Sequence, residues 1–555
     1  MNDKFSNFKV PYSPAKQFST RVAYFSMEFA LDQSLKTFSG GLGFLAGSHM
    51  RSAYELKQNM IGIGILWKFG YYDQVRNSDN NMAVLWQQKS YNFLEDTGIR
   101  FQVDVSDHPV WVAVWYLPPE RFESVPMFFL TTDVPENDYL SKTITNHLYD
   151  YNPEAKIAQS IILGVGGAKL IDIINFMPEV YHLNEAHGLS AAFYLYNKYK
   201  SAEEVRKRMV FTTHTPVEAG NEKHNFVDLE KMSFFQSIPV AEIRQITGIT
   251  GNIFDHSLVA LRLSKIANGV SAIHGDVARR MWGGYEGIAP ITSITNSQNK
   301  KYWADYKLEK AASENNVTAL EARKKELKYR LFINLADQTG KWFDPNVLTI
   351  VWARRFAGYK RANLITKDLD RFKQVFCNPQ RPIQVIWAGK PYPKDNGAIE
   401  MFNELVRLSA NYPNIAIMTG YEMRLSKLLK QGSDVWLNNP RIPMEASGTS
   451  GMTAAMNASI NLSTWDGWIP EFVENGKNGF VVPPVDYQNL TEQQQDDQDL
   501  INLLNIIEKD IASLYYNNPK SWYKLAIRAM KEVVPEFESG RMATEYYEKL
   551  YKYKR

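Results

Sequence analysis

Cysteine is almost absent from this sequence, with Cys377 as the single occurrence among 555 residues. One cysteine excludes an intramolecular disulfide and a cysteine-rich metal site, so we expect a reducing compartment. No apolar run approaches the roughly 20 residues that a membrane-spanning helix needs. The opening residues, MNDKFSNFKV, lack the apolar core of a secretory signal, so the sequence predicts a cytoplasmic protein with no membrane partner.

An excess of charge of one sign is also missing. Lysine and arginine total 63 against 60 aspartates and glutamates, which leaves a formal net charge of +3. Nucleic-acid-binding domains concentrate basic residues, and this balance gives no such signal, so no nucleic-acid partner is expected. Aromatic residues are plentiful at 13%. They suit sugar binding and a large core equally well.

Short apolar, β-favouring runs alternate with helix-favouring segments along the chain. Such runs stand near residues 22–29, 179–184 and 209–215, and the pattern restarts near residue 345. This alternation predicts an α/β protein with two Rossmann-like lobes, parallel sheets and a cleft between them. We predict an N-terminal lobe over 1–300, a C-terminal lobe over 301–530, and a C-terminal helix over 531–555 that packs back on the first lobe.

A glycine-rich segment follows the first predicted strand. Ser39-Gly40-Gly41-Leu42-Gly43 would let backbone N–H groups approach a ligand closely at the start of a helix. The spacing differs from the dinucleotide-binding fingerprint. Taken alone, the segment is better interpreted as a tight turn between strand and helix.

Four cations follow another apolar run directly, namely Arg354, Arg355, Lys360 and Arg361. Two such charges held ~6 Å apart repel by roughly 3 kcal/mol at an effective dielectric near 20. A bound anion would remove that penalty, and arginine can hold a phosphate through two parallel hydrogen bonds. The alternative interpretation is an ordinary solvated run of charge.

A third segment, residues 444–457, places Glu445 before a series of small residues and a helix-favouring run. Its helix start suits an anion, whereas Glu445 suits the hydroxyl groups of a sugar. His214 stands at the end of another predicted strand, and Asn184, Glu185 and His187 at the end of a third. The pair Glu185 and His187 lacks a third ligand, so we expect no metal site.

Together and in this order, these segments resemble the glycogen phosphorylase family, especially its short bacterial α-glucan phosphorylase branch. The similarity runs from YFSMEF at 24–29 to DVWLNNPRIPMEASGTSGM at 434–452 and covers nearly the whole chain. It implies a retaining GT-B glycosyltransferase of family 35. Such enzymes cleave terminal α-1,4-linked glucose from glycogen or maltodextrin with phosphate, giving glucose 1-phosphate. The resemblance also implies a homodimer and pyridoxal phosphate bound as a Schiff base, with its phosphate taking part in catalysis.

The resemblance assigns a role to each matching residue. The implied catalytic residues are Arg355, Lys360, His214 and Glu445. The implied substrate-binding residues are Gly41, Leu42, Asn296, Ala446, Ser447 and Gly448. The residues implied around the phosphate of a cofactor or nucleotide are Arg354, Lys360, Thr449, Ser450, Tyr421 and Trp303.

One position departs from the family pattern. The family carries its cofactor lysine where this chain has Thr453, and threonine has no amine with which to form an imine. We therefore expect no covalently bound cofactor at this position, which leaves three interpretations open. The protein is a phosphorylase that binds pyridoxal phosphate without a covalent bond, a glucosyltransferase that uses a sugar nucleotide as glycogen synthases do, or a catalytically inactive glucan-binding or regulatory protein.

Two features bear on that choice. Residues 478–484, NGFVVPP, resemble a stretch common in GT-B enzymes that use nucleotide sugars, which favours the second interpretation. Retention of Glu445, Arg355, Lys360 and His214 argues against the third, because a protein without catalysis has no physical need for a crowded cationic site.

Overall fold

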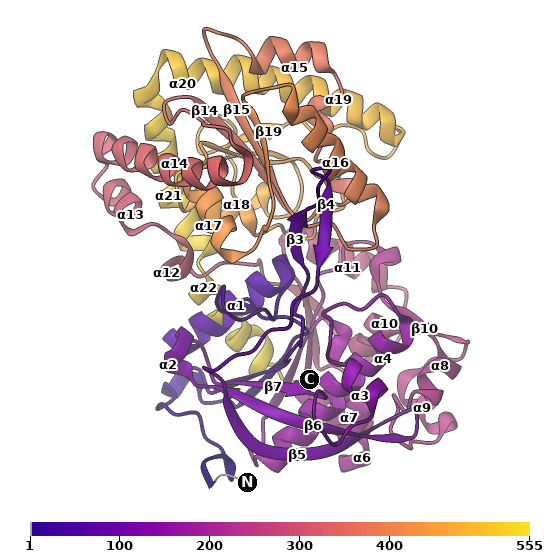
Figure 1. Cartoon of the computed structure of the whole chain (residues 1–555). Helices are drawn as coiled ribbons and strands as arrows, with labels where there is room; N and C mark the ends of the chain where they lie inside the picture. The colour runs from indigo at the N-terminus through magenta and orange to yellow at the C-terminus, as the bar shows by residue number, and fades with distance from the viewer. Residues whose placement is uncertain (1–2, 555) are drawn as a thin grey trace. The chain divides into compact units, whose positions relative to one another are not determined.

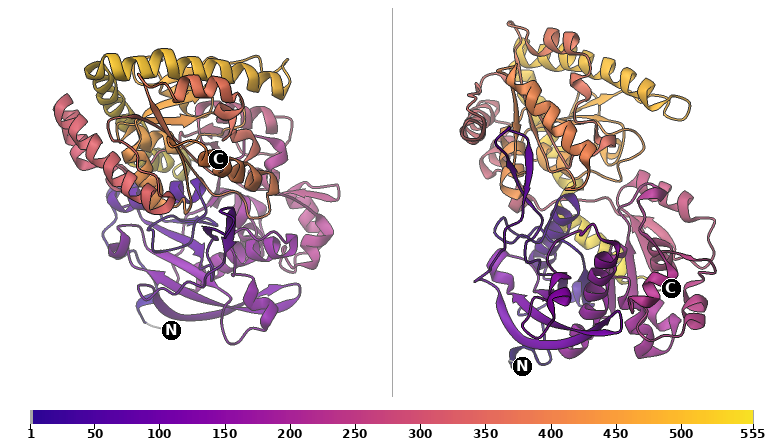
Figure 2. Two further views of the ribbon diagram at one scale, coloured as in Figure 1. Left: turned by 45° about the horizontal axis from the view of Figure 1, so that its top comes forward. Right: turned by 45° about the vertical axis from the view of Figure 1, so that its right-hand side comes forward.

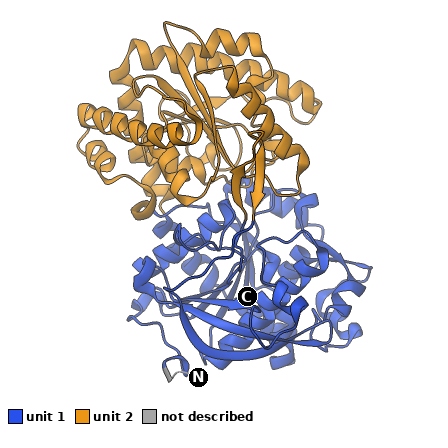
Figure 3. Ribbon diagram, viewed as in Figure 1, with its two compact units in different colours: residues 1–71, 86–299, 539–555 blue, residues 72–85, 300–538 orange. Residues whose placement is uncertain are grey.

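The computed structural model describes residues 3–554, which form two compact units (Figure 3). Unit 1 comprises residues 1–71, 86–299 and 539–555, and unit 2 comprises residues 72–85 and 300–538. The sequence predicted a change of lobe near residue 300 and a return of the C-terminal helix, residues 531–555, to the first lobe. The chain in fact passes between the units after residues 71, 85, 299 and 538.

Unit 1 is built on a nine-stranded sheet (Figure 1). In sheet order its strands are β13 (Ile291–Ser293), β12 (Ile266–Gly269), β9 (Met209–Thr212), β8 (Val180–Asn184), β1 (Val22–Phe25), β2 (Met60–Ile65), β7 (Met127–Thr131), β6 (His108–Leu117) and β5 (Glu95–Val105). Strands β13 to β7 pair in parallel, whereas β7, β6 and β5 pair antiparallel. The expected parallel sheet is present, with an antiparallel edge in addition.

Burial patterns explain this difference between the two parts of the sheet. Every residue of β1, β2, β8 and β9 is buried, as parallel strands covered on both faces require. Strand β5 instead alternates between buried and exposed positions, which is typical of an antiparallel strand with one solvated face. Figure 2 shows β5 and β6 curving along the edge of this sheet.

Helices cover the unit 1 sheet, and the chain's C-terminal segment contributes to its core. The helices are α1 (Gly41–Glu55), α2 (Pro119–Phe122), α3 (Tyr139–Thr143), α4 (Pro153–Ile161), α5 (Gly167–Ile173), α6 (Ala191–Tyr199), α7 (Ala202–Arg208), α8 (Phe226–Lys231), α9 (Val240–Thr247), α10 (His256–Arg262), α11 (Ala272–Trp282) and α22 (Ser539–Glu545). A small hairpin pairs β10 (Lys223–Asn225) with β11 (Ile253–Asp255). Met542, Tyr547 and Tyr551 are buried in one cluster with Val22 and Tyr24 of β1.

Unit 2 contains a six-stranded, entirely parallel sheet. In sheet order its strands are β16 (Ile415–Met418), β15 (Ile383–Ala388), β14 (Leu348–Ala353), β17 (Val435–Asn438), β18 (Ile460–Thr464) and β19 (Phe480–Val482). Its helices are α12 (Lys300–Trp303), α13 (Tyr306–Ser313), α14 (Val317–Thr339), α15 (Leu369–Phe376), α16 (Asn396–Ala410), α17 (Met423–Gly432), α18 (Ser450–Ala455), α19 (Glu492–Asn505), α20 (Ser513–Asn517) and α21 (Pro519–Phe537). The restart of the strand pattern that the sequence indicated near residue 345 coincides with β14, the first strand of this sheet along the chain.

The hairpin of β3 (Asp73–Arg76) and β4 (Met82–Leu85) belongs to unit 2 although its neighbours in sequence belong to unit 1. The Tyr72 hydroxyl donates to the Pro391 carbonyl over 2.7 Å, and the Gln74 amide donates to the Gly389 carbonyl over 2.9 Å. The Met82 N–H donates to the Asn403 side chain over 2.8 Å. These bonds join residues far apart in sequence, so no local pattern predicts them.

Within residues 3–554, no helix has both the length and the apolar character that a bilayer crossing requires. The His, Cys, Asp and Glu side chains of that range do not gather into a group of three or more that could hold a metal ion.

Candidate active site

The cationic segment after β14 lies against Glu445 in unit 2. Arg354 follows the last residue of the strand and is 5% exposed. Its Nη2 atom lies 2.7 Å from Oε2 of Glu445, and the Nζ atom of Lys360 lies 3.6 Å from the same oxygen. One carboxylate oxygen therefore neutralises part of two cationic charges.

The charges in this cluster change one another's ionisation. Burial alone would raise the pKa of Glu445, but Arg354 and Lys360 hold it at about 2. Burial and the neighbouring Arg354 lower the pKa of Lys360 to about 7, although Glu445 opposes the shift. Glu445 is thus ionised at neutral pH, while Lys360 is poised between its charged and neutral forms.

Arg354 retains hydrogen-bonding capacity after pairing with Glu445. Its Nε and Nη1 atoms are buried and have no hydrogen-bond partner among the described residues. Buried donors in folded proteins are nearly always satisfied, and an unsatisfied guanidinium edge indicates a missing acceptor. An anion with several oxygens, such as a phosphate, has the right chemistry.

A second buried carboxylate supports the loop that carries Glu445. The Glu445 N–H donates to Oδ2 of Asp466 over 2.9 Å, and burial raises the pKa of Asp466 to about 7. The adjoining Gly467 has φ of +62°, and a Cβ atom there would lie 2.3 Å from the Ser447 carbonyl. Glycine is therefore required for this close approach.

The other predicted residues of unit 2 lie on the same loops or next to them. Arg355 is exposed, beside the Tyr359 side chain. Ala446, Ser447, Gly448 and Thr449 join Glu445 to α18, whose first residue is Ser450. The Ser447 hydroxyl is buried without a partner among the described residues. Helix α18 has only six residues, so its dipole adds less to anion binding than the sequence suggested.

Position 453 is fully buried within α18. The Thr453 hydroxyl donates to the Ser450 carbonyl over 3.0 Å. The Asn457 side-chain amide donates both to the Thr453 carbonyl over 2.8 Å and to the Trp303 carbonyl over 3.0 Å. Trp303 therefore adjoins this helix, and Tyr421, also buried, stands just before α17.

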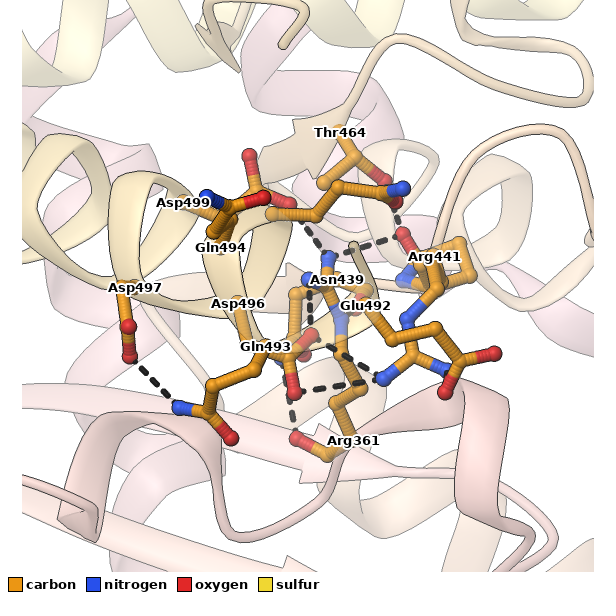
Figure 4. Close-up of polar contacts among 12 residues, drawn as sticks. Arg361, Asn439, Arg441, Thr464, Glu492, Gln493, Gln494, Asp496, Asp497 and Asp499 are labelled. Carbon is orange, nitrogen blue, oxygen red and sulfur yellow. Dashed lines mark hydrogen bonds and ion pairs between the residues drawn. The ribbon is translucent and has the colours of Figure 1, made fainter. Parts of the chain in front are cut away.

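A separate buried network ties the two loops of the site together (Figure 4). The guanidinium of Arg361 pairs with Asp496 over 3.0 Å and with Asp499 over 2.8 Å, both from α19. It also donates to the carbonyls of Asn439 and Pro440. Arg361 is therefore a structural cation, unlike its neighbour Lys360.

In unit 1, the glycine-rich segment is held by a carboxylate. Glu28 accepts hydrogen bonds from the N–H groups of Ser39 and Gly40, over 2.6 Å and 3.2 Å, and from the Tyr149 hydroxyl over 2.7 Å. Helix α1 begins at Gly41, which is exposed, and Leu42 is half-buried. The segment is thus a fixed turn whose first helical residues remain accessible.

His214 and Glu185 form the second group in unit 1. The His214 N–H donates to Glu185, and Nε2 of His214 lies 2.7 Å from Oδ1 of Asn184. Burial lowers the pKa of His214 to about 3 and raises that of Glu185 to about 7. Glu185 has φ of +64°, a strained conformation that is common at functional sites. Neutral His214 is available as a hydrogen-bonding group, not as a cation.

Asn296 is 4% exposed, and its side-chain carbonyl has no partner among the described residues. Asn478, from the segment that resembled nucleotide-sugar enzymes, has its amide committed to the Phe472 carbonyl over 2.9 Å and to Glu532 over 2.8 Å. Asn296 thus keeps an acceptor for a ligand, whereas the amide of Asn478 supports local structure.

Three functional features were missed from the sequence. They are the direct pairing of Glu445 with both cations, the support from Asp466, and the positioning of the glycine-rich turn by Glu28. The only available signal for Asp466 was its place at the end of a strand, in TWDG. Each of the other two depends on contacts between distant segments.

The comparisons with known proteins agree with the motifs. A family model described as carbohydrate phosphorylase matches residues 277–502. An uncharacterized protein of Methanocaldococcus jannaschii is 43% identical, over 96% of this chain and 99% of its own length. The maltodextrin phosphorylase of Thermococcus litoralis is 32% identical, over 99% of this chain and 73% of that protein. The glycogen phosphorylase of Aquifex aeolicus is 30% identical, over 99% of this chain and 90% of that protein. The chain belongs to the carbohydrate phosphorylase family.

Proposed function

We propose that the protein is a retaining α-glucan glycosyltransferase that cleaves terminal α-1,4-linked glucose with phosphate and releases glucose 1-phosphate. The observation that carries the proposal is the buried guanidinium of Arg354, whose Nε and Nη1 atoms have no hydrogen-bond partner within residues 3–554 and which shares Glu445 with Lys360. The named activities of the maltodextrin and glycogen phosphorylases that the chain resembles support the same reaction.

In this proposal the charged residues of unit 2 have two roles, which are to bind phosphate groups and to bind glucose. Arg354 and Lys360 hold the phosphate of a cofactor or nucleotide, and exposed Arg355 binds the substrate phosphate. Glu445 balances the first two charges and accepts hydrogen bonds from glucose hydroxyls. The Asp466 carboxylate positions Glu445 through its backbone N–H.

In this proposal the residues of unit 1 bind the sugar. His214 offers its ring and its backbone carbonyl. The side-chain carbonyl of Asn296, which has no partner in the described part of the chain, accepts a hydroxyl hydrogen. Gly41 and Leu42, at the start of α1, present backbone N–H groups to the substrate.

The residues of the site suit the phosphate group of pyridoxal phosphate, but residue 453 does not suit its aldehyde. Arg354 and Lys360 have the charge and the free donors for the phosphate, whereas Thr453 has no amine for the aldehyde. When bound, the cofactor would supply its phosphate as a proton-transferring group close to the substrate phosphate. The same cation pair could hold the distal phosphate of a sugar nucleotide, and Thr453 is the observation that favours this second candidate.

Activity assays separate these candidates. We expect glucose 1-phosphate when the protein is incubated with maltodextrin, phosphate and pyridoxal phosphate, detected by a coupled enzymatic assay. Chain extension from UDP-glucose or ADP-glucose, without phosphorolysis, would replace the first candidate with the second. Glucan binding with neither reaction would overturn both.

Two glycine substitutions test the role of the glycine-rich turn. A Cβ atom at Gly43 would lie 2.7 Å from both Glu28 Oε2 and Phe38 Cβ, whereas nothing lies within 4 Å of a Cβ at Gly41. Gly43→Ala is therefore expected to cost about 1–3 kcal/mol of stability, seen as a lower melting temperature. Gly41→Ala should leave the melting temperature unchanged and raise the KM for phosphate or glucan. An unchanged KM would remove Gly41 from the substrate site.

A further inference from the structure

A histidine to which the sequence assigned no role joins two of the predicted sugar-binding segments of unit 1. His274 lies in the first turn of α11 and is 1% exposed. Its Nε2 atom donates to the Thr215 carbonyl over 3.1 Å. The Val270 N–H donates to its Nδ1 atom over 3.2 Å. The imidazole therefore bridges the chain that follows β9 and the chain that follows β12.

The partners of this ring define its protonation state. A carbonyl oxygen can only accept, so Nε2 carries a hydrogen, and a backbone N–H can only donate, so Nδ1 keeps its lone pair. The bridge thus requires the neutral ring in this one tautomer. Burial lowers the pKa of His274 to about 4, although the bond to Thr215 opposes the shift, so the ring is neutral at pH 7.

The first end of the bridge adjoins His214. Glu185 accepts hydrogen bonds from the His214 N–H and, over 3.3 Å, from the Thr215 hydroxyl. His274 binds the Thr215 carbonyl, which Glu185 as an acceptor cannot bind. The two side chains together therefore determine how the backbone beside His214 is oriented.

The second end of the bridge adjoins Asn296. The Asn296 N–H donates to the Val270 carbonyl over 3.0 Å. The side-chain carbonyl of Asn296 has no partner in the described part of the chain and is the acceptor that we assign to a glucose hydroxyl. A series of hydrogen bonds therefore runs from the Thr215 carbonyl through His274 and the backbone of Val270 to Asn296.

Close packing of α11 determines where the His274 ring lies. The Ser271 hydroxyl caps the helix by accepting the His274 N–H over 3.1 Å. A Cβ atom at Gly269 would lie 2.8 Å from the Gly275 nitrogen, and one at Gly275 would lie 2.7 Å from Cβ of Ser293. The helix therefore packs against β12 and β13 at a distance that only glycine allows, and its first turn has no room to shift.

We propose that His274 is a positioning residue that holds His214 and Asn296 in place for the same glucose unit. The proposal rests on the proposed function, in which both of those residues bind that sugar. His274 does not touch the substrate and acts through the Thr215 carbonyl and the Val270 N–H. Groups that are held in place before a ligand arrives lose less conformational freedom on binding, so loss of the bridge should weaken sugar binding.

Binding of the sugar without turnover tests the proposal. Maltodextrin is titrated into the full-length protein in the absence of phosphate, and calorimetry gives the Kd. His274→Phe keeps a ring and removes both hydrogen bonds, so we expect it to raise the Kd by about tenfold. His49→Phe is the matched control and should keep the Kd, because His49 is also 1% exposed in unit 1 but its Nε2 atom has no partner within residues 3–554. Melting temperatures of both variants separate a loss of stability from a loss of binding.

Two smaller substitutions divide the bridge and replace His274→Phe if that variant does not fold. His274→Gln keeps a donor at the place of Nε2, and His274→Asn keeps an acceptor at the place of Nδ1. Each retains one of the two hydrogen bonds, so each should raise the Kd less than His274→Phe. The effect of His274→Asn, which loses the Thr215 bond, should largely disappear in a His214→Ala background, because a positioning residue has no effect once the group that it positions is gone.

Several results would overturn the role of His274. They are an unchanged Kd in the folded His274 variants, an equal rise in His49→Phe, effects of His274→Asn and His214→Ala that simply multiply, and no maltodextrin binding by the unaltered protein. The proposed reaction is decided separately. Maltodextrin binding that depends on His274, without glucose 1-phosphate release, would overturn the reaction alone. Glucose 1-phosphate release with an unchanged Kd in every His274 variant would overturn the role of His274 alone.

Discussion

Replacing Glu445 by glutamine is expected to lower the rate of glucose 1-phosphate formation by roughly 10²–10³-fold, a loss typical of removing one electrostatic group from an active site. The variant keeps the size of the side chain and loses the charge that Arg354 and Lys360 share at one oxygen. Glucose hydroxyls also lose their strongest acceptor. Steady-state assays with maltodextrin and phosphate measure the effect.

The pH profile of the same variant reports on Lys360. Glu445 opposes the fall in the pKa of Lys360, which is about 7. Without that negative charge the pKa falls further, so Lys360 keeps its proton only at lower pH. The basic limb of the activity profile should therefore move to lower pH.

Glu474→Gln is the matched control for this variant. Glu474 is more than half exposed and pairs with Lys477 on the surface, so its substitution should change neither rate nor profile. An unaltered rate and an unaltered basic limb in Glu445→Gln would show that the cluster does not act in catalysis.

Replacing Arg361 by methionine is expected to produce the largest loss of stability. The substitution removes the ion pair of Asp499, which is 4% exposed, whereas Asp496 keeps Lys367 at 2.7 Å and Arg441 at 3.1 Å. Removing one partner of a buried ion pair costs about 3–5 kcal/mol. For a unit of this size that corresponds to a fall of roughly 6–20 °C in melting temperature, which calorimetry can measure.

A second substitution shows whether the cost comes from uncompensated charge. Adding Asp499→Asn to Arg361→Met removes the carboxylate that has lost its cation, and part of the lost melting temperature should return. Arg371→Met is the control, because Arg371 pairs with Glu508 at a partly exposed site and should matter little. A fall of equal size in Arg371→Met, or no recovery in the double variant, would contradict this explanation.

Local patterns predicted much of the fold. The apolar runs that end at Phe25, Asn184, Ala353 and Asn438 are strands. Every residue in them is buried, which explains why these runs are apolar without interruption. The antiparallel edge of unit 1 was not predicted, because alternation of strands with helices indicates parallel pairing, whereas β5 and β6 follow each other with no helix between them. The place of residues 72–85 in unit 2 depends on hydrogen bonds to residues more than 300 positions away.

The candidate site, like the fold, was predicted only in part. The strand ends and the family motifs predicted which residues would gather after β14 and before α18. They did not predict that Glu445 would pair with two cations, because pairing depends on how two loops meet.

The interleaving of the two units along the chain has a consequence for biosynthesis. Domains usually fold one after another as the polypeptide leaves the ribosome. Here the core of unit 1 needs Tyr547 and Tyr551, and unit 2 needs the hairpin of residues 72–85 that is translated long before its partners. The core of unit 1 therefore stays incomplete until translation has passed residue 551, and its apolar residues remain exposed for longer than in a domain built from one continuous segment.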